Sequence, residues 1–71
     1  MTTYNGHKNW NHWNVSLWIN NDEGLYRMAR EKVKWYGKAK AAVILAGLLP
    51  SRTPDGAPYS VSAIRAALVG M

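Results

Sequence analysis

The segment that follows Asp22, up to Lys38, carries the clearest helical spacing of hydrophobic and polar positions in the chain. At about 100° per residue, one face of a helix over this range is apolar and the opposite face is charged. The apolar positions are Leu25, Met28, Ala29, Val33 and Tyr36. The opposite positions are Arg27, Arg30, Glu31, Lys34 and Lys38. Asp22 precedes them as an N-cap, with Glu23 in the first turn, so the pattern predicts an amphipathic helix. Lys32 falls inside the apolar sector, where it must snorkel or meet a carboxylate.

Residues 10–20 show two patterns that conflict. The helical one places apolar side chains at i, i+3 and i+7, namely Trp10, Trp13 and Leu17. The strand-like one alternates with polar residues and consists of Val15, Leu17 and Ile19. Because Asn9 is a good N-cap, we predict a helix from about 10 to 20 that ends at Asn20-Asn21, with a strand as the alternative. In the helix, the Trp10–Leu17 stripe is expected to pack on the core.

A third helix is predicted from Lys38 to about Leu49, after a break at Gly37. Its sequence is apolar nearly all round, which is typical of a helix at the centre of a fold. Small residues in it would allow neighbours to approach closely; they are Ala42, Ala46 and Gly47.

A loop and a last helix complete the predicted elements. Residues 50–58 contain all three prolines and the turn sequence Asp55-Gly56. Ser60 caps the last helix, and Gly70 ends it. Its inward residues are expected to be Val61, Ile64 and Leu68, with Arg65 facing outward.

These elements predict one all-α domain over residues 1–71, a compact bundle of three to four short helices around a central apolar helix. Residues 1–8 form a polar arm in this prediction, with a turn at Asn5-Gly6. A chain this small buries only about 60% of its unfolded surface, so dense packing or self-association would be needed for stability. A homodimer is therefore one of the expected assemblies.

The composition of the chain limits its possible cellular locations and the kinds of site it can form. The chain has no cysteine, which excludes disulfides, thiol catalysis and thiolate zinc sites. Residues 1–8 lack the apolar region of a signal peptide, and the longest apolar run, residues 41–49, is too short to span a membrane. We expect a protein of the bacterial cytoplasm that does not enter membranes.

No arrangement of residues in the sequence favours catalysis. The two histidines, His7 and His12, are five residues apart and lie on different sides of a helix, so they form no metal pair. Of the four carboxylates, Asp22 and Glu23 are engaged in capping, which leaves no acid–base pair. Asp55-Gly56 lacks the further oxygen ligands of a calcium loop. We predict no enzyme activity, no metal and no cofactor.

Charge and aromatic residues instead favour binding. The net charge is +5, and six of the nine lysines and arginines lie between Arg27 and Lys40. A clustered positive surface attracts nucleic acid or acidic protein; the alternative is a solvated helix face. Trp and Tyr are frequent hot-spot residues of interfaces. The candidate partner-binding residues are Arg27, Arg30, Lys34 and Lys38 of the basic face, Tyr26 and Trp35 beside it, and Trp18.

The C-terminal part has the outline of a helix-turn-helix motif. Residues 53–65 resemble the end of the accessory DNA-binding region of large serine recombinases. A recognition helix usually carries several long polar side chains. This one offers only Ser62 and Arg65 among alanines, so packing is the favoured role.

A further resemblance covers about residues 4–26. It rests on the strings Tyr4-Asn5-Gly6, Asn9-Trp10, Trp13-Asn14-Val15, Leu17-Trp18-Ile19 and Asn21-Asp22-Glu23-Gly24-Leu25-Tyr26. These are similar to a family of short, mostly uncharacterised proteins carried by phages, plasmids and other mobile elements. The chain departs from that pattern at His7, where a bulkier aromatic residue is usual, and after Tyr26.

The resemblance implies a genomic context, and no functional residue is carried over from it. Small cysteine-free proteins of mobile elements often inhibit host defence, the anti-CRISPR and anti-restriction proteins among them. Our leading hypothesis is a non-catalytic inhibitor of this kind, which binds an acidic patch or a nucleoprotein surface of a defence complex. The alternative is a small basic nucleic-acid-binding or regulatory protein.

Overall fold

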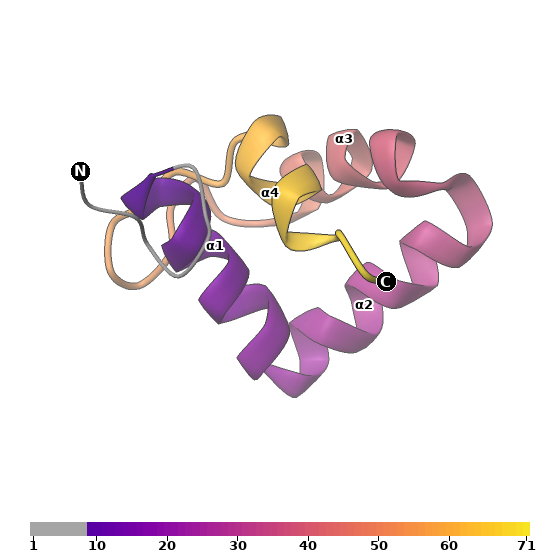
Figure 1. Ribbon diagram of the computed structural model, residues 1–71, viewed down its shortest axis with the longest axis horizontal. Coiled ribbons are helices and arrows are strands. Elements are labelled where there is room, and N and C mark those ends of the chain that lie inside the picture. The colour runs from indigo at the N-terminus through magenta and orange to yellow at the C-terminus, as the bar shows by residue number, and fades with distance from the viewer. Residues whose placement is uncertain (1–8) are drawn as a thin grey trace.

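The computed structural model describes residues 9–71, which form four α-helices and no named strand (Figure 1). The helices are α1 (Trp10–Asn21), α2 (Glu23–Tyr36), α3 (Lys38–Leu48) and α4 (Val61–Ala67). The predicted all-α bundle is confirmed. The predicted arm over residues 1–8, with its turn at Asn5-Gly6, lies outside the described residues. None of the helices within residues 9–71 has the length and apolarity needed to cross a membrane.

The predicted caps set the helix boundaries. The side chain of Asn9 accepts a hydrogen bond from the His12 amide at 3.0 Å, and Asp22 accepts one from the Leu25 amide at 2.9 Å. Ser60 caps α4 in the same way. Gly37 separates α2 from α3 with a φ of 81°, a left-handed value that favours glycine. Residues 10–21 are helical, so the strand alternative for this segment is wrong.

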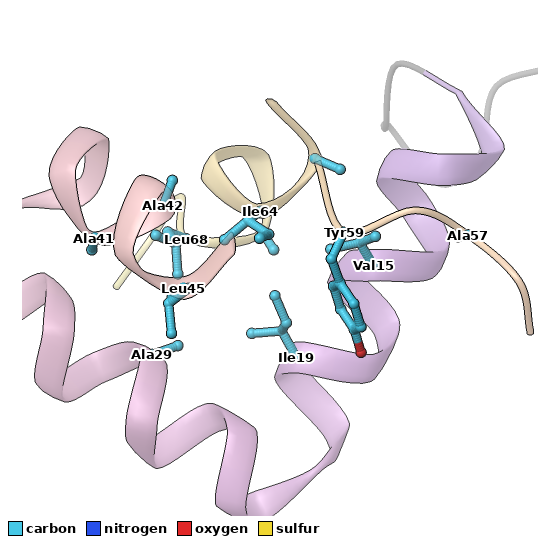
Figure 2. Close-up of a cluster of buried hydrophobic side chains, with 12 residues drawn as sticks. Val15, Ile19, Ala29, Ala41, Ala42, Leu45, Ala57, Tyr59, Ile64 and Leu68 are labelled. Carbon is cyan, nitrogen blue, oxygen red and sulfur yellow. The ribbon is translucent and has the colours of Figure 1, made fainter. Parts of the chain in front are cut away.

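The four helices pack in a closed cycle. α1 contacts α2 and α4, and α3 contacts the same two helices, so that α4 lies between α1 and α3 (Figure 1). Figure 2 shows side chains from all four helices meeting at the centre. The most deeply buried helix is α4, which contributes Ala63, Ile64 and Ala67 to the core, and its C-cap Leu68 is buried with them. Its small residues allow the neighbouring helices to approach it closely.

The predicted inward face of α1 is wrong. Trp10 and Leu17 are each 37% exposed, whereas Val15 and Ile19 are buried with Asn14. The buried pair is the β-branched one that produced the strand-like pattern. Asn14 hydrogen-bonds to the loop after α3, and this contact rotates α1 so that its indole stripe turns partly toward solvent.

Two other helices also differ from the prediction. α3 is apolar as expected but buries one side only, through Ala41, Ala42 and Leu45, and so lies at the periphery rather than at the centre. Val61 was predicted to face inward and is exposed, because α4 packs through its alanines. In α2, Lys32 does meet a carboxylate, with its Nζ 3.7 Å from Glu31 Oε1.

A buried polar contact joins α1 to the loop over residues 49–60. Thr53 Oγ1 donates to Asn14 Oδ1 at 2.6 Å, and Asn14 Nδ2 donates to Asp55 Oδ2 at 2.9 Å. The Ala57 amide donates back to Thr53 Oγ1 at 3.1 Å. Asn14 and Thr53 are the two buried polar residues of the described chain, and each is hydrogen-bonded. Together they hold the loop against α1.

Asn14→Ala is expected to lower the free energy of unfolding by about 1–3 kcal/mol, since it leaves buried groups without their partner. Asn11→Ala is the matched control on an exposed position of the same helix, where a change within about 0.5 kcal/mol is expected. Urea unfolding followed by circular dichroism measures both. Equal effects of the two substitutions would contradict a stabilising role for the Asn14 network.

Candidate functional site

The outer face of α2 carries most of the predicted partner-binding residues. Ala29 is buried and Val33 is half-buried, which turns the charged positions of the helix toward solvent. Arg27, Arg30 and Lys34 are exposed there. We call the set Tyr26, Arg27, Arg30, Lys34 and Trp35 the α2 face.

The cations of the α2 face have different partners. Arg27 pairs with Glu23 one turn earlier, with both side chains largely exposed, so the pair adds at most about 1 kcal/mol of stability. The Arg30 guanidinium carbon lies 5.8 Å from the centre of the Tyr26 ring, which is cation–π geometry. Within residues 9–71, neither Arg30 nor Lys34 forms an ion pair. Their charge therefore stays available to an anionic partner.

Beside these cations is a surface hollow of about 650 Å³. It is lined by Arg30, Glu31, Val33, Lys34, Trp35 and Met71. The Trp35 side chain is 71% exposed, the highest value among the tryptophans of the described chain. The structure thus places a large, accessible aromatic ring together with two cations.

Two predicted residues do not belong to the α2 face. Lys38 lies beyond the Gly37 break, in the first turn of α3. Trp18 lies on α1, where its indole Nε1 donates to Asp55 Oδ2 at 3.0 Å. The indole of Trp18 is half-buried and its polar group is already hydrogen-bonded within the fold.

Trp18 lines a second groove, of about 600 Å³, where α1, α2 and the loop meet. Its walls are mostly apolar and include Trp18, Leu25, Met28, Pro50, Pro54 and Tyr59. Tyr59 was not among the predicted site residues, and it is buried although it follows the proline-rich segment directly. Burial, and secondarily the negative charge of Asp22, raises the pKa of the Tyr59 phenol above its ordinary value of 10.0. Two of the three loop prolines, Pro50 and Pro54, line this groove.

The helix ends also bring together a histidine and a serine far apart in the sequence. His12 Nε2 lies 3.0 Å from Ser62 Oγ, which joins α1 to α4. The carboxylate side chains of residues 9–71 contact other groups: Asp22 caps α2, Glu23 pairs with Arg27, Glu31 lies beside Lys32, and Asp55 accepts from Asn14 and Trp18. Among residues 9–71, no three His, Asp or Glu side chains are grouped so as to hold a metal ion.

The helix-turn-helix outline is not supported by the burial of α4. Three of its side chains and that of its C-cap, Leu68, are in the core, and the exposed residues include Ser62 and Arg65. A recognition helix must present a row of side chains to a DNA groove. The packing role favoured for α4 is confirmed.

The Trp18–Asp55 contact predicts a pH-dependent change in the second groove. Hydrogen bonds from Asn14 first, and Trp18 second, hold the pKa of the Asp55 carboxyl below its ordinary value of 3.8. The hydrogen bonds to the ionised Asp55 stabilise the fold above about pH 4, and this stabilisation is lost as the pH falls through the lowered pKa. In proton–nitrogen correlation spectra, we expect the Trp18 indole N–H signal to move with a midpoint below 3.8.

The exposed indole of Trp35 is the internal control in that titration, because the structure gives it no carboxylate partner. Its signal should stay nearly constant over the same range. A Trp18 signal that does not respond, or responds with a midpoint above 3.8, would contradict the hydrogen bond to Asp55.

Comparison with known proteins gives one match. Residues 1–69 match the model of a family described as "Family of unknown function (DUF7249)". No curated protein and no solved structure matches the chain. The matched range includes all four helices, the α2 face and the second groove. The chain therefore belongs to the DUF7249 family, whose function is unknown.

Proposed function

We propose that this protein is a non-catalytic inhibitor from a phage or another mobile element, which binds a host defence complex such as a CRISPR effector in the bacterial cytoplasm. It acts by occupying a surface of that complex. The observation that carries the proposal is the exposed Trp35 beside Arg30 and Lys34 on the α2 face.

An exposed tryptophan of this kind supports a binding role. Trp35 contributes little to the core, since most of its surface is accessible to water. Tryptophan and arginine dominate interface hot spots because they bury large areas with few rotatable bonds. Stacking on Tyr26 limits the orientations of the Arg30 guanidinium, which lowers the entropy lost when it binds.

The charge of the α2 face indicates the kind of partner. Arg30 and Lys34 share their hollow with one carboxylate side chain, that of Glu31, which already contacts Lys32. A chain of net charge +5 does not imitate the phosphates of DNA. An acidic protein patch, or an anionic segment of a nucleoprotein, complements this face and accelerates association.

The inhibitor role itself rests on the resemblance of residues 4–26 to proteins of mobile elements. Most of this segment is α1 and the start of α2. These residues position the α2 face, since the Asp22 cap sets where α2 begins. The resemblance therefore concerns the scaffold of the proposed surface rather than its cations.

Direct nucleic-acid binding is the second candidate, favoured by the aromatic residues among the cations. Tyr26 and Trp35 flank Arg30 and Lys34, an arrangement compatible with stacking of single-stranded bases. In this case the contact would be to phosphates and would depend strongly on salt.

The inhibitor proposal predicts a gain in phage plating. Strains that carry defined CRISPR or restriction systems, expressing this protein, should plate a targeted phage at higher efficiency than strains without it. The double variant Arg30→Glu/Lys34→Glu should lose at least about tenfold of this gain, as expected for a loss of more than about 1.4 kcal/mol in binding.

The matched control is Lys40→Glu/Arg65→Glu, which changes the net charge equally at exposed positions outside the α2 face. It should retain the activity, and circular dichroism should show both variants helical. No gain on any strain, or equal loss in both double variants, would refute the proposal.

A gel shift with arbitrary single- and double-stranded DNA separates the two candidates. The inhibitor proposal expects little retardation even at about 50 mM salt. Strong retardation that falls by about tenfold or more on moving to about 200 mM salt, as expected for two to three phosphate contacts, would instead establish the nucleic-acid-binding alternative. Trp35→Ala should weaken such binding more than Trp10→Ala, the matched tryptophan control on α1.

A further inference from the structure

The second groove contains a buried tyrosine whose polar group the described fold does not use. Tyr59 is only 7% exposed, yet within residues 9–71 its hydroxyl makes no hydrogen bond. Because every fully buried side-chain oxygen or nitrogen of the described chain has a partner, the unbonded hydroxyl must reach solvent. It does so in the groove that Tyr59 lines. A buried tyrosine usually bonds through its hydroxyl, and here the groove is where a partner can reach it.

Two side chains of opposite charge line the same groove from different walls. Asp22 caps α2 through Oδ1, which accepts from the Leu25 amide at 2.9 Å; among residues 9–71, no group donates to its Oδ2. Arg52 lies in the loop, where one of its five N–H groups donates to the Gly56 carbonyl at 2.8 Å. Asp22 and Arg52 form no ion pair with each other. The groove therefore presents a negative and a positive charge at separate places.

A glycine keeps the groove open beside the Asp22 carboxylate. Gly24 does not have a positive φ, and a Cβ atom built on it would meet only Asp22 Oδ1 within 4 Å, at an ordinary contact distance of 3.4 Å. Alanine would therefore fit and would favour the helix. Since Gly24 lines the groove, the missing side chain leaves room for a ligand at the carboxylate.

The walls of the groove are held in place by the fold itself. The Tyr59 amide donates to the Ser51 carbonyl at 3.0 Å, which closes the loop. On α1, the Trp18 indole is bonded to Asp55. A preformed site loses less conformational entropy on binding, and a volume of about 600 Å³ lies within the range of small-ligand sites.

We infer that the second groove binds a short apolar peptide, of two or three residues, with both termini free. Its ammonium group pairs with Asp22, its carboxylate pairs with Arg52, and its backbone bonds to the Tyr59 hydroxyl. Its apolar side chains pack on Trp18 and Met28. A single amino acid carries both charges on one carbon, whereas a peptide carries them at its two ends, as the separate walls require. This role is independent of the α2 face.

Proton–nitrogen correlation spectra of the full chain test the inference with the dipeptide Leu-Phe as the probe. At up to about 10 mM, Leu-Phe should shift the Trp18 indole N–H signal to saturation and leave that of Trp35, outside the groove, unchanged. N-acetyl-Leu-Phe and Leu-Phe amide each lack one charge and should bind at least about threefold more weakly. The doubly blocked peptide should bind at least about tenfold more weakly.

Two groove variants identify the contacts without disturbing the fold. Tyr59→Phe removes a hydroxyl that has no partner in the described fold, so it should leave the urea midpoint unchanged and weaken Leu-Phe binding at least about threefold. Tyr26→Phe, outside the groove, is the matched control. Asp22→Asn retains a good N-cap. It should weaken the binding of Leu-Phe but not that of N-acetyl-Leu-Phe, and Glu23→Gln should change neither.

The inference is overturned if Leu-Phe gives no saturable shift of the Trp18 signal. It is also overturned if the doubly blocked peptide, which resembles an interior segment of a protein, binds as tightly as the free one. Unchanged Leu-Phe affinity in both Tyr59→Phe and Asp22→Asn would overturn it as well.

Discussion

The hydrogen bond from Thr53 to Asn14 determines how the rest of the molecule is arranged. It joins α1 to the loop that leads into α4, across 39 residues of sequence. A buried amide without a partner would destabilise so small a fold, so the loop must stay where Asn14 can reach it. The same contact sets the rotation of α1, which directs Val15 and Ile19 to the core and leaves Trp10 partly exposed.

The tryptophans of the second groove and of the α2 face differ in how they are held. Trp18 is tied to Asp55 and belongs to the wall of a groove. Trp35 has no comparable tie and stands among cations on the outer side of α2. Trp18 therefore forms part of the groove wall, whereas the exposed Trp35 is available to a partner.

The local features of the chain were predictable, and the long-range ones were not. Three helix starts were predictable because N-cap residues bond to amides within four residues; these residues are Asn9, Asp22 and Ser60. The charged side of α2 was predictable from the helical spacing of its apolar and charged residues. The rotation of α1 depends on Thr53, which no periodicity in residues 10–20 can reveal. The partial exposure of α3 was missed for a similar reason, since α4, with its alanines, takes the central place. For the site, the outward cations of α2 were predictable, whereas the hydrogen bond that holds Trp18 was not, because its partner Asp55 lies 37 residues away.

Asp55 is followed by glycine, a pair prone to spontaneous isomerisation when the glycine nitrogen attacks the aspartyl side chain. Folding restrains both reactants here. The carboxylate is held by Asn14 and Trp18 in its ionised, poorly electrophilic form, and the Gly56 amide is bonded to the Thr53 carbonyl at 2.9 Å. The chemical ageing of this peptide bond is thus coupled to the integrity of the loop, and isoaspartate would accumulate chiefly in molecules that have lost their native packing.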